Sequence, residues 1–189
     1  MFQTHPLDLH EIRSRIASNL DLKDLATCAR VSQDWNDSFT PPLYNSVVLT
    51  RDDLSMESAE RNKHLIRSLK IQSSAYENLS LTSARDKVVL SVMANSTLTT
   101  LDLEDNSIGD YGTQALSEAL KTNSTLTTLN LRDNSIRDTG AQALSEALKT
   151  NSTLTALDLE DNLIEDNGAQ ALSEALRANS TVAIIGFMF

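Results

Sequence analysis

The sequence predicts an α/β solenoid in which parallel strands line a concave face and helices cover the convex face, preceded by a small three-helix module. Three observations lead to this expectation. A unit of 28 residues repeats along the C-terminal part of the chain. Each unit opens with alternating leucines and continues with an apolar stripe at helical spacing. The first fifty residues lack this repeat and have a helical spacing of their own.

The strands are predicted from a short string that recurs. LTTLDL begins at Leu98, LTTLNL at Leu126 and LTALDL at Leu154, a step of 28 residues each time. The leucines in the alternating part of each string face one side of a short strand. Related strings predict further strands at residues 66–71 and 182–187, and a leading strand at 47–49. One strand and one helix cannot enclose a core, so the units must stack.

A helix is expected after each strand, because the string G-x-Q-A-L-S-E-A-L places apolar residues on one helical face. An aspartate two residues before each glycine is expected to act as the N-cap. The glycines themselves indicate a backbone constraint where the helix begins. The three Asp/Gly pairs are Asp110 and Gly112, Asp138 and Gly140, and Asp166 and Gly168.

Two sets of asparagines recur with the same period. The first set follows the strands and is expected to stack, with its amides satisfying backbone groups where each strand turns away. It comprises Asn106, Asn134 and Asn162. The second set opens an N-S-T string between helix and strand and suits a left-handed helix C-cap. It comprises Asn95, Asn123, Asn151 and Asn179.

Charge restricts the class of partner. The formal net charge is -10, and residues 98–181 alone hold 14 acidic and 5 basic side chains, a difference of -9. An acidic surface repels phosphate backbones, which excludes nucleic acid as an expected partner. It favours a basic protein or peptide, although the charges could serve only to keep the solenoid in solution.

No pattern predicts catalysis, a metal, a cofactor or a small-molecule substrate, so the protein is not expected to be an enzyme. Cys28 is the sole cysteine, the three histidines are scattered, and no glycine-rich phosphate loop occurs. No apolar run is long enough to span a bilayer, and the N-terminus is charged where a signal peptide is apolar. These features predict no membrane association and a cytoplasmic or nuclear location.

The outward positions of the predicted strands form the expected target-binding face. They carry acidic and polar side chains around one arginine, and no aromatic anchor. The positions expected to contact a protein target are Thr100, Asp102, Glu104, Asn130, Arg132, Asp158 and Glu160.

The N-terminal segment predicts three short helices. Leu9, Ile12, Ile16 and Leu20 share one helical face, and Pro41 helps to end the helical section. Three short helices bury too little apolar surface to be comfortable alone, so the module is expected to dock on a partner.

The 28-residue unit, LxxLxLxxNxIxDxGAxALSEALKxNST, resembles the ribonuclease-inhibitor type of leucine-rich repeat, which NOD-like receptors also use. The resemblance covers about residues 66–189. It implies a curved solenoid that binds proteins on its concave strand face. The chain stops inside a strand without a polar capping repeat, and we expect truncation, a fragment or pairing with another chain.

The N-terminal segment resembles an F-box in the order Glu-Ile, spaced Ile and Leu, Asp-Leu, Val-Ser and Trp, although the family's opening Leu-Pro is missing. The resemblance implies binding to the small adaptor of an SCF-type cullin–RING ubiquitin ligase. The residues implied to bury against that adaptor, or to form the three-helix core, are Leu9, Ile12, Ile16, Leu20, Leu25, Val31 and Trp35.

Together the resemblances imply an F-box/leucine-rich-repeat protein that recruits a target, possibly basic, to an SCF-type E3 ligase. The alternative is a repeat scaffold, inhibitor or sensor module unconnected to ubiquitin, with the N-terminal helices as a cap of the solenoid. The expected domains are an F-box-like module at 1–45, a leading strand and connecting segment at 46–65, and repeats at 66–189.

Overall fold

The computed structural model describes residues 46–50, 63–72, 90, 93–94 and 96–185. Apart from Ser46 and Val47, they belong to one compact unit, Val48–Phe189. Six strands form one sheet in chain order, and consecutive strands from β2 to β6 pair in parallel. They are β1 (Ser46–Thr50), β2 (Ser68–Gln72), β3 (Thr100–Asp102), β4 (Thr128–Asn130), β5 (Ala156–Asp158) and β6 (Ala183–Ile185).

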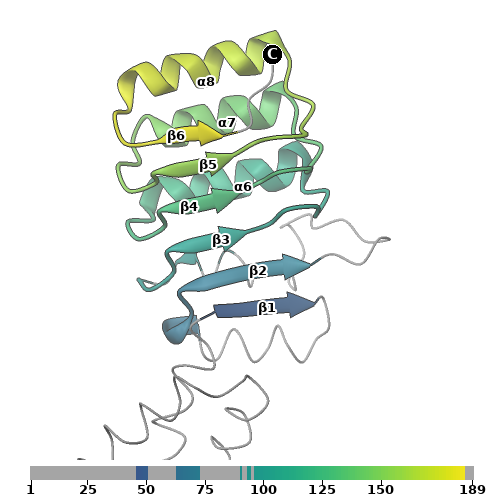
Figure 1. Cartoon of the computed structure of the whole chain (residues 1–189). Helices are drawn as coiled ribbons and strands as arrows, with labels where there is room; N and C mark the ends of the chain where they lie inside the picture. Colours follow the sequence, from purple (N-terminus) through teal and green to yellow (C-terminus); the bar gives the residue numbers. More distant parts are fainter. Residues whose placement is uncertain (1–45, 51–62, 73–89, 91–92, 95, 186–189) are drawn as a thin grey trace, which may run out of the picture. The chain divides into compact units, whose positions relative to one another are not determined.

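Three helices cover one face of this sheet, each between two consecutive strands (Figure 1). They are α6 (Gly109–Thr122), α7 (Asp138–Leu148) and α8 (Asp166–Ala178), and a 3-10 turn, η1 (Lys63–Leu65), precedes β2. This arrangement confirms the predicted leucine-rich-repeat solenoid. In the described part of the chain, no helix has the length and apolar character needed to cross a bilayer.

The strand register makes the repeats equivalent in space. Leu101 of β3 pairs with Leu129 of β4, which pairs with Leu157 of β5. All three leucines are fully buried, whereas their strand neighbours are half-buried. Burying a leucine contributes about 1.5–3 kcal/mol, so the layered leucines supply much of the driving force for stacking.

The first asparagine set forms the predicted ladder between repeats. Asn134 Oδ1 accepts hydrogen bonds from the backbone N–H groups of Asn106 and Ile108, both at 3.2 Å. Its Nδ2 donates to the carbonyls of Leu103 and Arg132 at 2.8 and 2.9 Å. Asn134 is fully buried, so these bonds satisfy backbone groups that water does not reach. The prediction of a structural asparagine ladder is confirmed.

The aspartates cap a different helix from the one predicted. Asp110 and Asp138 lie inside the first turns of α6 and α7, and no side chain caps these helices at Ile108 or Arg137. Asp110 Oδ1 instead accepts the N–H groups of Arg137 and Gly140, at 2.8 and 3.0 Å, at the start of α7. Each aspartate therefore satisfies the free N–H groups of the next helix in the stack.

This arrangement explains the recurring glycine. A Cβ on Gly140 would lie 2.8 Å from Asp110 Oδ1, and one on Gly168 would lie 2.7 Å from Asp138 Oδ1. Neither glycine has a positive φ. The backbone constraint predicted at these glycines is thus the close approach of the capping carboxylate.

The second asparagine set also joins repeats, but not as left-handed caps. Asn123 and Asn179 end α6 and α8 with extended backbones, at φ -75° and -103°. Asn151 Nδ2 donates to the carbonyls of Leu120 and Asn123, and its Oδ1 accepts the N–H of Leu154. The prediction of left-handed caps is wrong, because the side chain reaches carbonyls of the preceding repeat.

Candidate protein-interaction face

The outward positions of the strands meet across neighbouring repeats. Asp102 pairs in register with Asn130, which pairs with Asp158, and Lys70 of β2 pairs with Asp102. We define the strand face as Lys70 together with the seven predicted target-binding positions. All eight are half-buried, so their side chains are accessible and partly held by neighbours. The structure therefore brings the predicted residues together on one surface.

Lys70 neutralises one edge of this face. Its Nζ lies 2.7 Å from Asp102 Oδ2 and 3.5 Å from Glu104 Oε2. The hydrogen bond to Asp102 raises the pKa of the Lys70 ammonium, and the opposing effect of burial is smaller. Asn130 Nδ2 continues the row by donating to Asp102 Oδ1 at 3.0 Å. Asp102 is thus held by both neighbouring strands.

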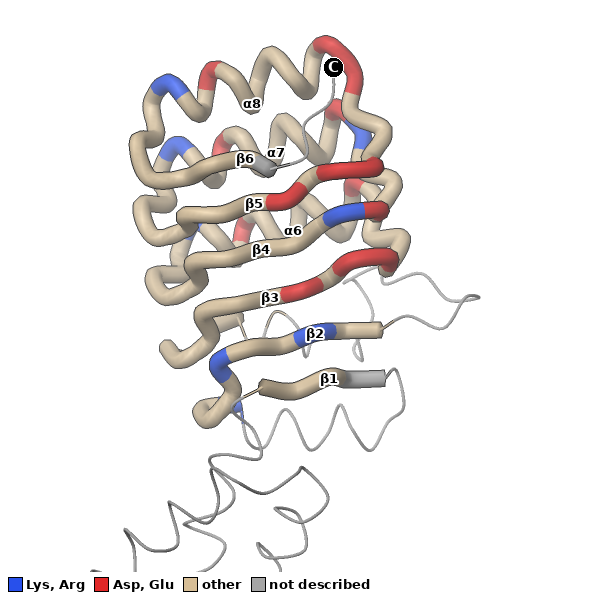
Figure 2. Tube along the Cα trace, in the orientation of Figure 1, with Lys and Arg blue, Asp and Glu red and all other residues tan. Residues whose placement is uncertain are grey.

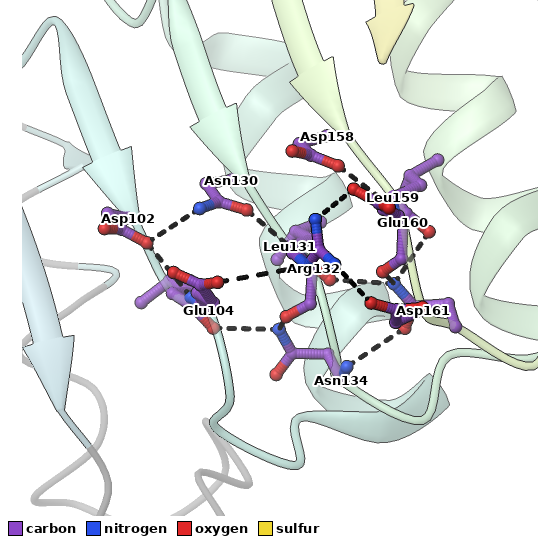
Figure 3. A network of polar contacts seen from close by, with 12 residues as sticks. Asp102, Glu104, Asn130, Leu131, Arg132, Asn134, Asp158, Leu159, Glu160 and Asp161 are labelled. Carbon is purple, nitrogen blue, oxygen red and sulfur yellow. Dashed lines mark hydrogen bonds and ion pairs between the residues drawn. The ribbon is translucent and has the colours of Figure 1, made fainter. Parts of the chain in front are cut away.

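Arg132 organises the other half of the face (Figure 3). It forms ion pairs with Glu160 and, at 2.6 Å, with Asp161, and its Nε lies 4.0 Å from Glu104 Oε1. Burial lowers the pKa of the Arg132 guanidinium, but the carboxylates of Glu160 and Asp161 more than offset it, and the pKa is raised. The central arginine therefore cross-links three repeats instead of standing free.

Sequence reasoning missed Lys70 as a member of this face. The signal was present, because Lys70 occupies the outward position of the string that begins at Ile66. The unit that follows it is longer than 28 residues, so the alignment with Asp102 is hidden in the sequence. Extending the outward rows to every predicted strand would have identified it.

The face is suited to binding rather than to catalysis. It combines four carboxylates with two cations, a net charge of -2, and most of these groups are paired with one another. Among the described residues, no three His, Cys, Asp or Glu side chains are grouped to hold a metal. The predicted adaptor-binding residues, from Leu9 to Trp35, lie outside the described residues.

Comparisons with known proteins agree with this architecture. The leucine-rich repeat family matches residues 94–117, 122–145 and 150–173, and the F-box-like family matches residues 10–50. No curated protein matches the chain closely enough to compare.

Two solved structures share the fold. One is the leiomodin-1 actin-binding site 2, with 22% identity and a TM-score of 0.57 over 71% of this chain and 77% of that chain. The other is the tropomodulin C-terminal domain from Caenorhabditis elegans, with 14% identity and a TM-score of 0.58 over 71% and 83%.

The sequence matches, the parallel sheet and the repeated helices define an interaction protein rather than a reaction centre. An F-box-like segment precedes a leucine-rich-repeat array in a single chain. The chain belongs to the F-box/leucine-rich-repeat proteins.

Proposed function

We propose that this protein is a substrate-recruiting receptor of an SCF-type cullin–RING E3 ubiquitin ligase. The single observation that carries the proposal is the F-box-like segment at residues 10–50, directly ahead of the repeats. In this proposal the N-terminal segment binds the ligase adaptor, and the repeats bind the protein to be ubiquitinated. The chemistry belongs to other subunits, and the protein works in the cytoplasm or the nucleus.

The strand face supports the target-binding half of the proposal. Its charged side chains are held in register by ion pairs and by the asparagine row, which limits the entropy lost when a partner binds. Seven of its eight residues come from three successive repeats, so a partner lying across the strands would contact all of them.

A calorimetric titration of the full chain with the SCF adaptor tests the adaptor-binding half. We expect one-to-one binding that is lost in Trp35→Ala and in Ile12→Asp, because these residues match the F-box pattern. Arg132→Gln, on the strand face, is the matched control and should bind the adaptor like the wild type. Absence of binding by a folded wild-type sample would reject the receptor role and leave a repeat scaffold unconnected to ubiquitin.

A further inference from the structure

A second surface borders the strand face. We define the turn rim as residues 104–111, 132–139 and 160–167, which lead from each strand into the first turn of its helix. The rim holds nine acidic and two basic residues, a net charge of -7. Figure 2 shows acidic positions gathered where β3 and β5 end and in the turns that follow.

The rim differs from the strand face in how its charges are used. Lys70 and Arg132 pair with the carboxylates of the strand face, whereas Asp105 and Asp133 are exposed and form no ion pair with any described residue. Both aspartates have a left-handed backbone, at φ 54° and 53°, which fixes where their side chains leave the turn. The rim therefore presents negative charge that the repeats do not compensate internally.

Two apolar side chains stand among these acids. Tyr111 is 80% exposed in the first turn of α6, and Leu163 is 49% exposed in the turn after β5. The neighbouring repeats place polar residues at both positions. Tyr111 corresponds to Thr139 and Asn167, and Leu163 corresponds to Ser107 and Ser135. The two departures from the repeat on this rim thus expose apolar surface where the repeat itself would be polar.

Exposed aromatic side chains are the residues that most often dominate protein-binding energy. Tyr111 and Leu163 lie two repeats apart, roughly 10 Å at the usual strand spacing of about 4.8 Å. One partner segment crossing the turns can therefore reach both. The surrounding acids select the charge of that segment and steer its approach.

We propose that the turn rim binds a basic segment of a protein partner, with Tyr111 and Leu163 as apolar anchors and Asp105 and Asp133 as charge contacts. The inference rests on the proposed function, in which the repeats recruit a target. It adds that the affinity for the target resides largely on the turns, and that the segment combines lysine or arginine with apolar side chains.

The test uses the full chain and a short fluorescent peptide that alternates lysine and leucine. Its counterpart with glutamate in place of lysine is the charge control. We expect anisotropy to report binding of the lysine peptide only, weakened by added salt. Binding of neither peptide, or equal binding of both, overturns the proposal.

Variants taken from the repeat itself test the anchors without disturbing the fold. Tyr111→Thr combined with Leu163→Ser restores the polar residues of neighbouring repeats, and we expect Kd to rise about tenfold or more. Gln142→Ala, an exposed change on α7, should leave Kd unchanged. An unchanged Kd in the anchor variant, with its thermal unfolding unaltered, overturns the role of the anchors.

The adaptor titration separates this inference from the proposed function. The anchor variant should retain adaptor binding, because Tyr111 and Leu163 lie in the repeats. A chain that binds the lysine peptide but not the adaptor would reject the ubiquitin-ligase role and retain the rim as a binding surface. A chain that binds the adaptor but discriminates neither peptide would reject the rim alone.

Discussion

The carboxylate of Asp110 accepts a hydrogen bond from the backbone N–H of Gly140, thirty residues later, at 3.0 Å. The same oxygen accepts the N–H of Arg137. A side chain on one helix thus supplies the N-terminal cap of the next, and the glycine provides the space that this contact needs. The capping bond is at once a helix signal and an attachment between repeats.

Gly140→Ala is therefore expected to destabilise the protein, although alanine favours helices by about 1 kcal/mol over glycine. The new Cβ would lie 2.8 Å from both Asp110 Oδ1 and Ile136 Cγ2. We expect a net loss of about 1–3 kcal/mol in the free energy of unfolding, measured in urea. Gln142→Ala is the control, and a Gly140→Ala variant as stable as this control would contradict the steric explanation.

Asp138→Ala should remove the cap of α8 and cost about 0.5–2 kcal/mol. Asp138 Oδ1 accepts the N–H groups of Glu165 and Gly168 at 2.8 and 3.0 Å. Asp166 is the matched control, because it occupies the same place in α8 but caps no helix in the described part of the chain.

The comparison with Asp166→Ala cancels the general benefit of an acidic residue in the first turn of a helix. Asp138→Asn should recover most of the stability, since its amide oxygen accepts the same bonds. Equal losses in Asp138→Ala and Asp166→Ala, measured by thermal unfolding, would argue against capping between repeats.

Asn134→Ala should be among the most damaging polar substitutions, at about 3–5 kcal/mol, because it leaves buried backbone groups without partners. Asn130→Ala is the natural comparison. Asn130 bonds Asp102 and the N–H of Arg132 on the half-buried strand face, where water can replace it. We expect it to cost about 1 kcal/mol or less, and hydrogen exchange should locate the difference at the turns beside residue 134.

Arg132→Gln should lower stability by up to about 1 kcal/mol at low salt, and by less at high salt, because its ion pairs are partly exposed. The substitution leaves the carboxylates of Glu104, Glu160 and Asp161 close together without a cation. Arg137→Gln is the control, since Arg137 is exposed and has no ion pair among the described residues. A loss that does not change with salt would show that Arg132 acts through packing instead.

The fold followed from the sequence because the repeat states its own period. Alternating leucines identified the strands, and the register of Leu101 with Leu129 is one period. The caps were harder to predict because sequence distance hides spatial neighbours. Asp110 lies next to its own helix in sequence, and only the stacking of repeats brings it to Gly140.

The binding surface was predictable in part for a related reason. Alternation along a strand identified outward positions such as Asp102 and Arg132, which the structure places on one face. The pairing of Lys70 with Asp102 crosses an irregular unit, so no fixed period indicates it. The exposure of Tyr111 depends on how the first turn of α6 packs, which the order of residue types does not specify.

The trans-capping aspartate has a consequence for how such a chain changes over generations. Every contact between repeats joins equivalent atoms one period apart, so loss of residues 123–150 would bring Asp110 to Gly168 and Asn106 to Asn162 with the same chemistry. Duplication of that stretch would extend the array just as conservatively. A single inserted residue, in contrast, would misalign the aspartate and both asparagines at once. The gene can therefore alter the reach of the binding surface in whole-period steps, while small insertions are selected against everywhere except between the repeats' contact points.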